Sequence, residues 1–567
     1  MTEAEPGDRS ALATLAHEYW EGVLRRNPVL ATFLGDYRYN DRLPDVGPAG
    51  RAQEEAELRE VLQRLEPLRD AAFDVEDRLT WDMLRLAVQA GLDALRLRLD
   101  EMSVDQMDGP QVWLLELLNW HPTDTPEHVQ QLIARFRAFG SYMDQYLDVL
   151  HDGIRDRRTA PTIAVERVIG QLQGLLGTPI DQSPLTAPAP RQPERVASEL
   201  RGAVQDVVYP AFQRMLEFLQ DYLVRHARKD PGVWSVTDGD QIYALLARQH
   251  TTTELGPDEL HQMGRDDLDQ IHREMRAIMQ QRGAGDTSIR LFTEGLTRDP
   301  HNLPADRDEL LQMAEQLLAS AQAALPRAFG RLPRLPLVVK PIEQFRERDA
   351  PAAYYFQGAE DGSRPGIFYI NTFEPSARPK HTLPALAFHE GVPGHHLQVA
   401  LAQETRDLPA FRRLSAGWLG TAFVEGWALY TERLADELGL YADELARFGM
   451  LGYQAWRACR LVVDTGLHHL RWSREQAVEF FFDNVGLTER ETVNEVDRYI
   501  VWPGQALAYK VGQREIEATR RDRQTALGDR FDLRAFHDEL LRHGPLPLSS
   551  LRTVVAGGKI RPPWPNE

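Results

Sequence analysis

The sequence holds a single cysteine, Cys459, among 567 residues. One thiol cannot form an intrachain disulfide, and a zinc site built from cysteines needs several of them. Any metal must therefore be bound by other side chains. The composition allows a substantial core without covalent links, because 43% of the residues are hydrophobic and 26% are charged.

The chain also lacks long apolar runs and an excess of positive charge. No apolar stretch approaches the roughly 18 residues that cross a bilayer. The chain begins MTEAEPGD, an acidic and polar start without the apolar core of a secretory signal. The formal net charge of -20 argues against nucleic acid, whose phosphates need basic patches. We expect a cytoplasmic protein with neither a membrane nor a nucleic-acid partner. The sequence leaves the oligomeric state open, a homodimer included.

Helical periodicity dominates the chain and predicts a mainly α fold. Long helical patterns cover residues 51–105, 126–155, 161–177, 256–282 and 306–328. The proline-rich segment 178–193 is typical of an exposed loop. We expect it to separate an N-terminal helical lobe, residues 1–190, from a catalytic region, residues 191–567. A single continuous domain is the alternative.

The pattern changes over residues 336–372. Three β-type runs occur there, Leu337 to Val339, Ala353 to Phe356, and Gly366 to Asn371. They predict a small sheet directly before the segment on which the candidate site depends.

That segment, Phe388 to Gln398, has the sequence FHEGVPGHHLQ. A His-Glu pair followed by further histidine lets a helix offer ligands to a metal and a carboxylate to the metal-bound water. In the usual H-E-x-x-H pattern the second histidine follows four residues after the first, about 6 Å along the helix axis. Here Pro393 takes that position, and the next histidines are His395 and His396.

An undistorted helix would not form a site from these residues. His396 would share the face of His389 but lie about 10 Å further along, and His395 would point elsewhere. Pro393 and Gly394 supply a distortion, because proline removes a backbone donor and glycine tolerates unusual dihedrals. We favour His395 as the second ligand, since it restores the usual spacing with the smallest insertion. His396 is the alternative.

This motif, together with Glu425-Gly-Trp-Ala, Pro503-Gly-Gln-Ala and Tyr509-Lys, resembles a bacterial family catalogued as domain of unknown function 885. The likeness runs from the region of Asn27 to about residue 550. The family is similar to the gluzincin metallopeptidases, which take a third zinc ligand from a glutamate on a later helix. The resemblance implies a large multi-helical, zincin-like body with a small β-sheet beside the active-site cleft, and zinc as the cofactor.

Glu425 is the candidate third ligand. It stands among apolar residues in AFVEGWALY, and burying a lone glutamate there is costly unless it meets a cation. Pairing with an arginine or exposure to water are the structural alternatives. Glu432, further along the same helical pattern, could perform the same task but is flanked by charges.

Glu390 is the candidate general base, because it adjoins a ligand histidine and can move a proton from metal-bound water to a leaving amine. A tyrosine hydroxyl can hydrogen-bond the developing oxyanion, a role that gluzincins often give to Tyr or His. Tyr509 is the first choice and Tyr499 the second. Arg498 could hold a peptide carboxylate with two hydrogen bonds. Each could instead be a packing tyrosine or a surface arginine.

Two further assignments concern substrate. Asp464 and His468 are spaced four residues apart in an apolar helix and could orient a ligand histidine or bind substrate. A structural Asp-His pair is the alternative. By resemblance, Gly366 to Asn371 would form the exposed edge that binds an extended peptide, with Asn371 among the substrate contacts. A small structural hairpin is the alternative.

The sequence as a whole predicts a zinc metallopeptidase, and the resemblance to the gluzincins implies that it cleaves short peptides. Hydrolysis of a non-peptide amide or ester by the same metal is one alternative. A binding scaffold without catalytic activity is the other.

Overall fold

The computed structural model describes residues 6–342, 347, 351–359, 362, 364–414, 420–485 and 488–555. The chain forms two compact units. The N-terminal unit comprises Ser10–Ala71 and Arg85–Ile242, and the C-terminal unit comprises Met1–Arg9, Ala72–Leu84 and Tyr243–Glu567. The expected division at residue 190 falls inside the N-terminal unit.

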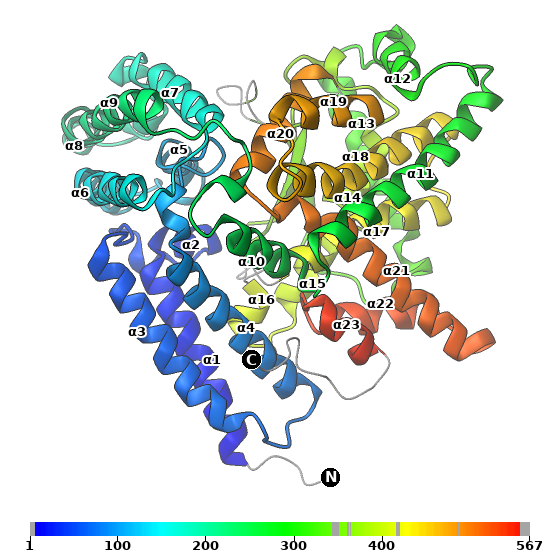
Figure 1. Ribbon diagram of the computed structural model, residues 1–567, viewed down its shortest axis with the longest axis horizontal. Coiled ribbons are helices and arrows are strands. Elements are labelled where there is room, and N and C mark those ends of the chain that lie inside the picture. The colour runs from blue at the N-terminus through cyan, green and yellow to red at the C-terminus, as the bar shows by residue number, and fades with distance from the viewer. Residues whose placement is uncertain are drawn as a thin grey trace. The chain divides into compact units, whose positions relative to one another are not determined.

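The N-terminal unit is built from helices packed around a large apolar core. The core centres on α6, where Phe136 and Phe139 are fully buried and the ring of Phe139 lies 5.0 Å from that of Phe212 on α9. Figure 1 shows α1 and α3 side by side, and Arg25 and Glu57 join them through an ion pair of 2.7 Å. The helices are α1 (Pro6–Arg26), α2 (Pro28–Leu34), α3 (Pro48–Leu65), α4 (Val75–Leu97), α5 (Pro110–Trp120), α6 (Pro126–Asp156), α7 (Thr162–Leu176), α8 (Glu194–Ala203), α9 (Tyr209–Arg225) and α10 (Gly239–Thr251), of which α1, α4 and α10 include residues of both units.

The segment 178–193 differs from the exposed loop that its prolines predict. It forms short 3-10 turns over Ile180–Gln182, Pro184–Thr186 and Ala189–Arg191, and Leu185 and Ala189 are buried in the core. Proline fixes φ near the value that such a turn requires, so a proline-rich segment can pack as consecutive turns.

The C-terminal unit contains the remaining helices. They are α11 (Pro257–Gln281), α12 (Ile289–Arg298), α13 (Arg307–Ala324), α14 (Leu383–Glu390), α15 (His395–Glu404), α16 (Ala410–Leu414), α17 (Thr421–Glu437), α18 (Glu444–His468), α19 (Arg474–Val485), α20 (Glu489–Val501), α21 (Ala508–Leu527), α22 (Leu533–Leu541) and α23 (Leu548–Val555). The fold class is therefore the predicted one, mainly α with a small sheet. No helix in the described part of the chain is long and apolar enough to span a membrane.

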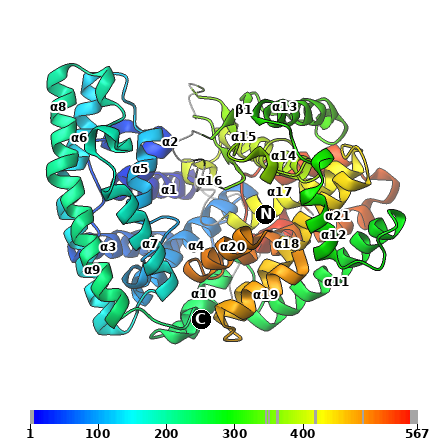
Figure 2. The same cartoon turned by 90° about the horizontal axis from the view of Figure 1, so that it is seen from above.

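The sheet consists of β1 (Leu337–Pro341), β2 (Ala353–Phe356) and β3 (Gly366–Ile370), so the three predicted strands are confirmed. Their order is β1-β3-β2, with β1 parallel and β2 antiparallel to β3. Figure 2 shows β1 beside α13, and β2 contacts α14. The expectation that Gly366 to Asn371 forms an exposed edge is wrong, because β3 has a strand on each side. The edge that reaches α14 belongs to β2.

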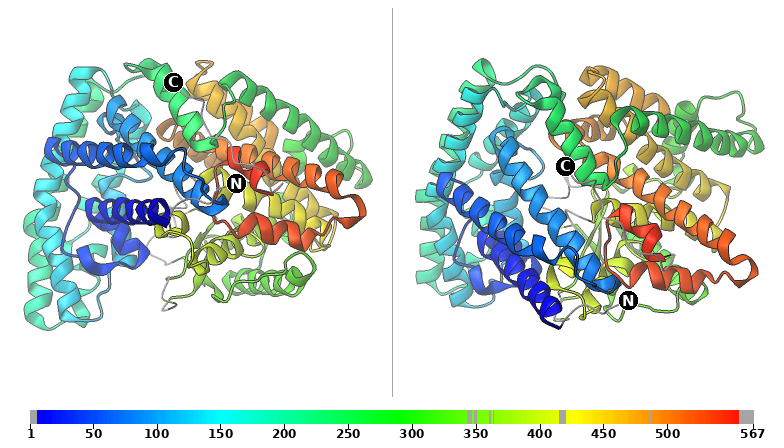
Figure 3. Two further views of the ribbon diagram at one scale, coloured as in Figure 1. Left: turned by 90° about the horizontal axis from the view of Figure 1, so that it is seen from below. Right: turned by 60° about the horizontal axis from the view of Figure 1, so that its bottom comes forward.

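Two helix pairs of this unit approach unusually closely. A Cβ on Gly512 of α21 would collide with the carbonyl oxygen of Ala422 on α17, and a Cβ on Gly426 would collide with the backbone of Gly512. Glycine at both positions therefore lets α17 and α21 pack backbone to backbone. Helices α11 and α18 form the other close pair. Figure 3 shows α21 (orange) next to α23 (red), which packs against it.

Candidate metal centre

The predicted distortion at Pro393 is a complete break. Helix α14 begins after Thr382 and ends at Glu390, and α15 begins at His395. Proline cannot continue the helix, since it lacks the backbone donor. A Cβ at Gly394 would collide with the carbonyl oxygen of His389, so only glycine allows the chain to pass this close to the end of α14. As a result the rings of His389 and His395 lie 4.8 Å apart.

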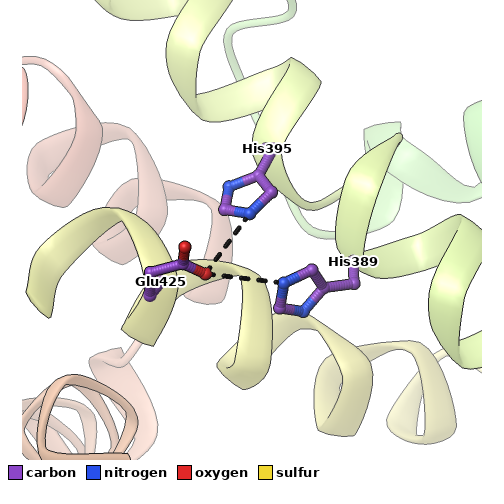
Figure 4. Close-up of side chains that lie close together, drawn as sticks. All are labelled: His389, His395 and Glu425. Carbon is purple, nitrogen blue, oxygen red and sulfur yellow. Dashed lines mark ion pairs between the residues drawn. The ribbon is translucent and has the colours of Figure 1, made fainter. Parts of the chain in front are cut away.

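Glu425 of α17 completes a cluster with these two histidines. Figure 4 shows the three side chains pointing toward one another. The carboxylate Oε2 of Glu425 lies 3.6 Å from Nε2 of His389 and 3.5 Å from Nε2 of His395. The three ligand atoms all lie within 4.8 Å of one another. Such separations are long for hydrogen bonds, but ligands bound to zinc at ~2.1 Å in a tetrahedron stand about 3.4 Å apart.

The Oε2 atom of Glu425 carries a further indication. It is buried, and none of the described residues forms a hydrogen bond with it. An unsatisfied buried acceptor costs about 1 to 3 kcal/mol, and more if it is charged. A divalent cation between Glu425 and the two imidazoles would remove that cost. Two imidazole nitrogens and one carboxylate oxygen are also a donor set of catalytic zinc sites, where a fourth position stays open. The residues therefore fit the zinc that the sequence predicts.

The histidines and glutamates of the cluster shift one another's pKa. Burial alone would lower the pKa of His389, but the carboxylates of Glu425 and Glu432 raise it to about 9. Burial would raise the pKa of Glu425, but His389 and His395 hold it well below its usual range. The geometry thus favours an ionised Glu425 facing positive charge.

His396, the alternative ligand, points elsewhere. Its Nε2 lies 3.1 Å from the carbonyl oxygen of Leu335, and its Nδ1 lies 3.2 Å from the hydroxyl of Tyr355. Burial lowers its pKa to about 4. The structure therefore brings His395, and not His396, to His389 and Glu425.

Glu432 has a role that the sequence did not reveal. It is fully buried, and its Oε1 accepts a hydrogen bond from Nδ1 of His389 at 2.9 Å. Its Oε2 accepts another from the side-chain amide of Gln454 on α18, also at 2.9 Å. A carboxylate behind a ligand histidine fixes the ring and selects the tautomer that presents Nε2. The available signal was the spacing of Glu425 and Glu432, which places both on one face of α17.

Glu390 lies at the end of α14, next to the edge of the sheet. Its Oε2 accepts a hydrogen bond of 2.8 Å from the backbone N–H of Tyr355 on β2. This contact fixes the position of the Glu390 carboxylate. The side chain remains partly exposed to solvent.

The two candidate tyrosines occupy different surroundings. Burial raises the pKa of Tyr509, and the charge of Glu425 raises it further, so Tyr509 lies within electrostatic reach of the cluster. The hydroxyl of Tyr499 is buried, donates to Glu495 Oε2 at 2.6 Å and accepts from Nε of Arg460 at 3.0 Å. Of the two, Tyr509 is better placed to meet a ligand.

Arg498 and the pair of Asp464 and His468 are engaged in structural contacts. Two nitrogens of Arg498 donate to Glu495, and a third donates to Oε1 of Gln505 at 2.6 Å. Asp464 accepts from the Tyr243 hydroxyl at 2.7 Å and from the Gly504 N–H at 3.1 Å. A ring nitrogen of His468 lies 2.9 Å from the carbonyl oxygen of Tyr499.

Asn371, at the end of β3, is also buried among backbone groups. Its side-chain nitrogen donates to the carbonyl oxygens of Glu347 and Pro351 at 2.6 and 3.2 Å, and its Oδ1 accepts from the N–H of Phe373 at 2.9 Å. These contacts connect the start of the loop after β3 to the segment that precedes β2.

The fold and the cluster together define a mainly α-helical protein with a candidate His-His-Glu metal centre beside a small sheet. A family model described as "Bacterial protein of unknown function (DUF885)" matches residues 28–555. The chain belongs to this family, as the resemblance of its motifs predicts.

Two solved structures share the fold. One is a protein of Colwellia psychrerythraea, provisionally described as a lipoprotein, with 28% sequence identity and a TM-score of 0.90 over 97% of this chain and 99% of the other. The second, from Shewanella oneidensis, is provisionally described as a lipoprotein of unknown function. It has 17% identity and a TM-score of 0.74 over 96% of this chain and 99% of the other. No curated protein matches the chain.

Proposed function

We propose that the protein is a zinc-dependent metallopeptidase that hydrolyses peptide bonds in short peptides. The observation that carries the proposal is the convergence of His389 Nε2, His395 Nε2 and Glu425 Oε2, with the carboxylate oxygen 3.6 and 3.5 Å from the two nitrogens. The hydrogen bond from His389 to Glu432 supports it, because a metal-ligating histidine usually donates its other ring N–H to a carboxylate or a carbonyl oxygen.

His389, His395 and Glu425 would hold the metal. A bound zinc ion supplies Lewis acidity and lowers the pKa of a coordinated water toward neutrality. Glu390 accepts the proton of the attacking water at its carboxylate and donates it to the amine that leaves. The hydroxyl of Tyr509 donates a hydrogen bond to the oxyanion, and the backbone of β2 beside Glu390 offers an extended peptide a strand to pair with.

Two alternative functions remain distinct from this one. The same residues could hydrolyse a non-peptide amide or ester, which a panel of peptides, other amides and esters separates. A binding scaffold would retain its fold and lack turnover of every compound in that panel.

The cytoplasm is the location proposed for this protein. The description of both structural relatives as lipoproteins favours the cell envelope instead. Fractionation of cells that express the protein at its natural level would decide between the two.

The test of function compares the zinc-loaded wild type with Glu390→Gln on a mixture of short peptides, followed by mass spectrometry. We expect cleavage by the wild type and a decrease in rate of about 10²- to 10⁴-fold in the variant, since a general base contributes that much. Both proteins should bind zinc equally, because Glu390 is not a ligand. Absence of peptide cleavage by zinc-loaded wild type would contradict the proposal.

A further inference from the structure

Arg457 of α18 is a buried cation that has no counterion among the described residues. Arg457 is only 5% exposed. Its Nε and one terminal nitrogen, Nη1, are buried with no hydrogen-bond partner among the described residues. The same part of the chain places no carboxylate in an ion pair with it. The neighbouring buried arginines differ, since Arg460 and Arg498 both pair with Glu495 at 3.0 Å.

Arg457 lies close to the metal ligands. Gln454, one turn earlier on α18, hydrogen-bonds Glu432, which in turn accepts from His389. Residues three apart share a helix face, so Arg457 lies on the face of α18 that holds this chain of contacts. Its charge also acts to lower the pKa of His389, which agrees with that placement.

Two aromatic rings hold the guanidinium of Arg457 in place. Its central carbon lies 4.7 Å from the ring centroid of Tyr453 and 5.0 Å from that of Trp456. Stacking of this kind orients the guanidinium plane but leaves its N–H groups free to donate in that plane. The aromatic contacts therefore position the cation without satisfying its hydrogen bonds.

Arg460 presents a second unsatisfied donor on the same helix face. Its Nη1 is buried without a hydrogen-bond partner in the described part of the chain, although its other nitrogens bind Tyr499 and Glu495. The guanidinium carbon of Arg460 lies 4.1 Å from the ring centroid of Tyr509, the residue that senses the charge of Glu425. The guanidinium of Arg460 therefore lies next to Tyr509, the candidate oxyanion donor.

A buried guanidinium without an anion is costly, and the cost disappears when a carboxylate binds with two parallel hydrogen bonds. We infer that Arg457, with Nη1 of Arg460 beside it, binds the free C-terminal carboxylate of a short peptide and directs cleavage to the bond near that end. This inference rests on the proposed peptidase function and names its substrate class, peptides with an unblocked C-terminus.

The binding test uses the full-length, zinc-loaded protein and two small probes. N-acetyl-L-alanine carries the carboxylate, and N-acetyl-L-alaninamide is its neutral counterpart. Calorimetry should detect at least tenfold tighter binding of the acid by the wild type and no preference in Arg457→Met. Arg447→Met is the matched control, because Arg447 lies on the same helix in a partly exposed ion pair with Asp436 and should keep the preference.

A preference for the acid that survives Arg457→Met would overturn the inference, since the carboxylate would then bind elsewhere. Equal or tighter binding of inorganic phosphate than of the acid would also overturn it, because the site would select phosphate. Thermal unfolding separates binding from a structural role. Without ligand, Arg457→Met should unfold at the same or a higher temperature than the wild type, whereas a structural cation would make the variant less stable.

Catalysis supplies the second readout. Wild type should cleave N-acetyl-dialanine with a KM at least tenfold below that for N-acetyl-dialaninamide, and Arg457→Met should raise only the first of these two KM values. Equal cleavage of acid and amide by the wild type contradicts the inference alone. Cleavage of neither peptide, together with a calorimetric preference for the acid, contradicts the peptidase function and leaves the carboxylate site intact.

Discussion

Nδ1 of His389 donates to Oε1 of Glu432 across 2.9 Å, and both side chains are buried. Because Glu425 and Glu432 come from the same helix, α17 supplies a candidate ligand and also the group that orients another. A metal site assembled in this way depends on α17 both for the ligand Glu425 and for Glu432, which orients His389. The break between α14 and α15 brings the second histidine, His395, to the site.

Glu432→Gln should weaken zinc binding without unfolding the protein. Loss of a carboxylate behind a ligand histidine typically costs about 10- to 100-fold in metal affinity. Competition with a chromogenic chelator measures the dissociation constant. Glu437→Gln on the same helix is the control, since Glu437 pairs at the surface with Arg520. An unchanged zinc affinity in Glu432→Gln would show that this contact does not support a metal.

Substitution of His395 should affect zinc binding, whereas substitution of His396 should affect stability. His395→Gln should abolish stoichiometric zinc binding, because it removes a ligand. His396→Gln should keep one zinc per chain but lower stability by roughly 1 to 3 kcal/mol, since the hydrogen bonds to Leu335 and Tyr355 are disturbed in a buried place. Zinc analysis and urea unfolding provide the two readouts. Loss of zinc in His396→Gln with retention in His395→Gln would reverse the assignment.

The tyrosines should differ in what they support. Tyr509→Phe should reduce kcat by about 10²- to 10³-fold with little change in KM, as expected on loss of one oxyanion donor. Tyr499→Phe should mainly reduce stability, because the Tyr499 hydroxyl binds Glu495 and Arg460 in the core. Steady-state kinetics on a cleaved peptide, with thermal unfolding of both variants, make the comparison. A large kcat effect confined to Tyr499→Phe would exchange the two roles.

Acid should destabilise the C-terminal unit partly through Glu76. Burial would raise the pKa of Glu76, but His543 and Arg412 lower it to about 2. A carboxyl whose pKa is depressed on folding stabilises the protein above its unfolded pKa, and that contribution disappears as the pH falls through the folded value. The wild type should therefore lose stability between about pH 4.5 and pH 2.

Glu76→Gln removes this particular titration. The difference in unfolding free energy between wild type and variant should shrink as the pH falls across that window, when both are measured by urea unfolding. A difference that stays constant from pH 6 to pH 3 would show that Glu76 is not the group involved.

The sequence predicted the broad fold because its signals are local. Periodicity and turn residues identify the strands and the long helices, including α6 and α7, without reference to the rest of the chain. The order of the strands was missed, since the pairing of β3 between β1 and β2 depends on contacts over long separations. A strand's own residues do not state whether it lies at an edge.

The candidate site was predictable to the extent that spacing constrains it. Pro393 and Gly394 together predict a distortion of the helix, and the break that they cause brings His395 toward His389. The role of Glu432 was not apparent, because a charged residue on an exposed and on a buried helix face look alike in sequence. Arg498, which was predicted to meet substrate, pairs with Glu495, one turn before it. Arg457 has no such acidic partner in the described structure, and this difference between two arginines is not visible in the sequence.

The most direct test of the metal site is a crystal structure of the zinc-loaded protein with anomalous diffraction data collected on both sides of the zinc absorption edge. We predict one anomalous peak per chain, about 2.1 Å from Nε2 of His389, Nε2 of His395 and a carboxylate oxygen of Glu425. A map without a peak among these three side chains, or with a peak on other residues only, would contradict the account.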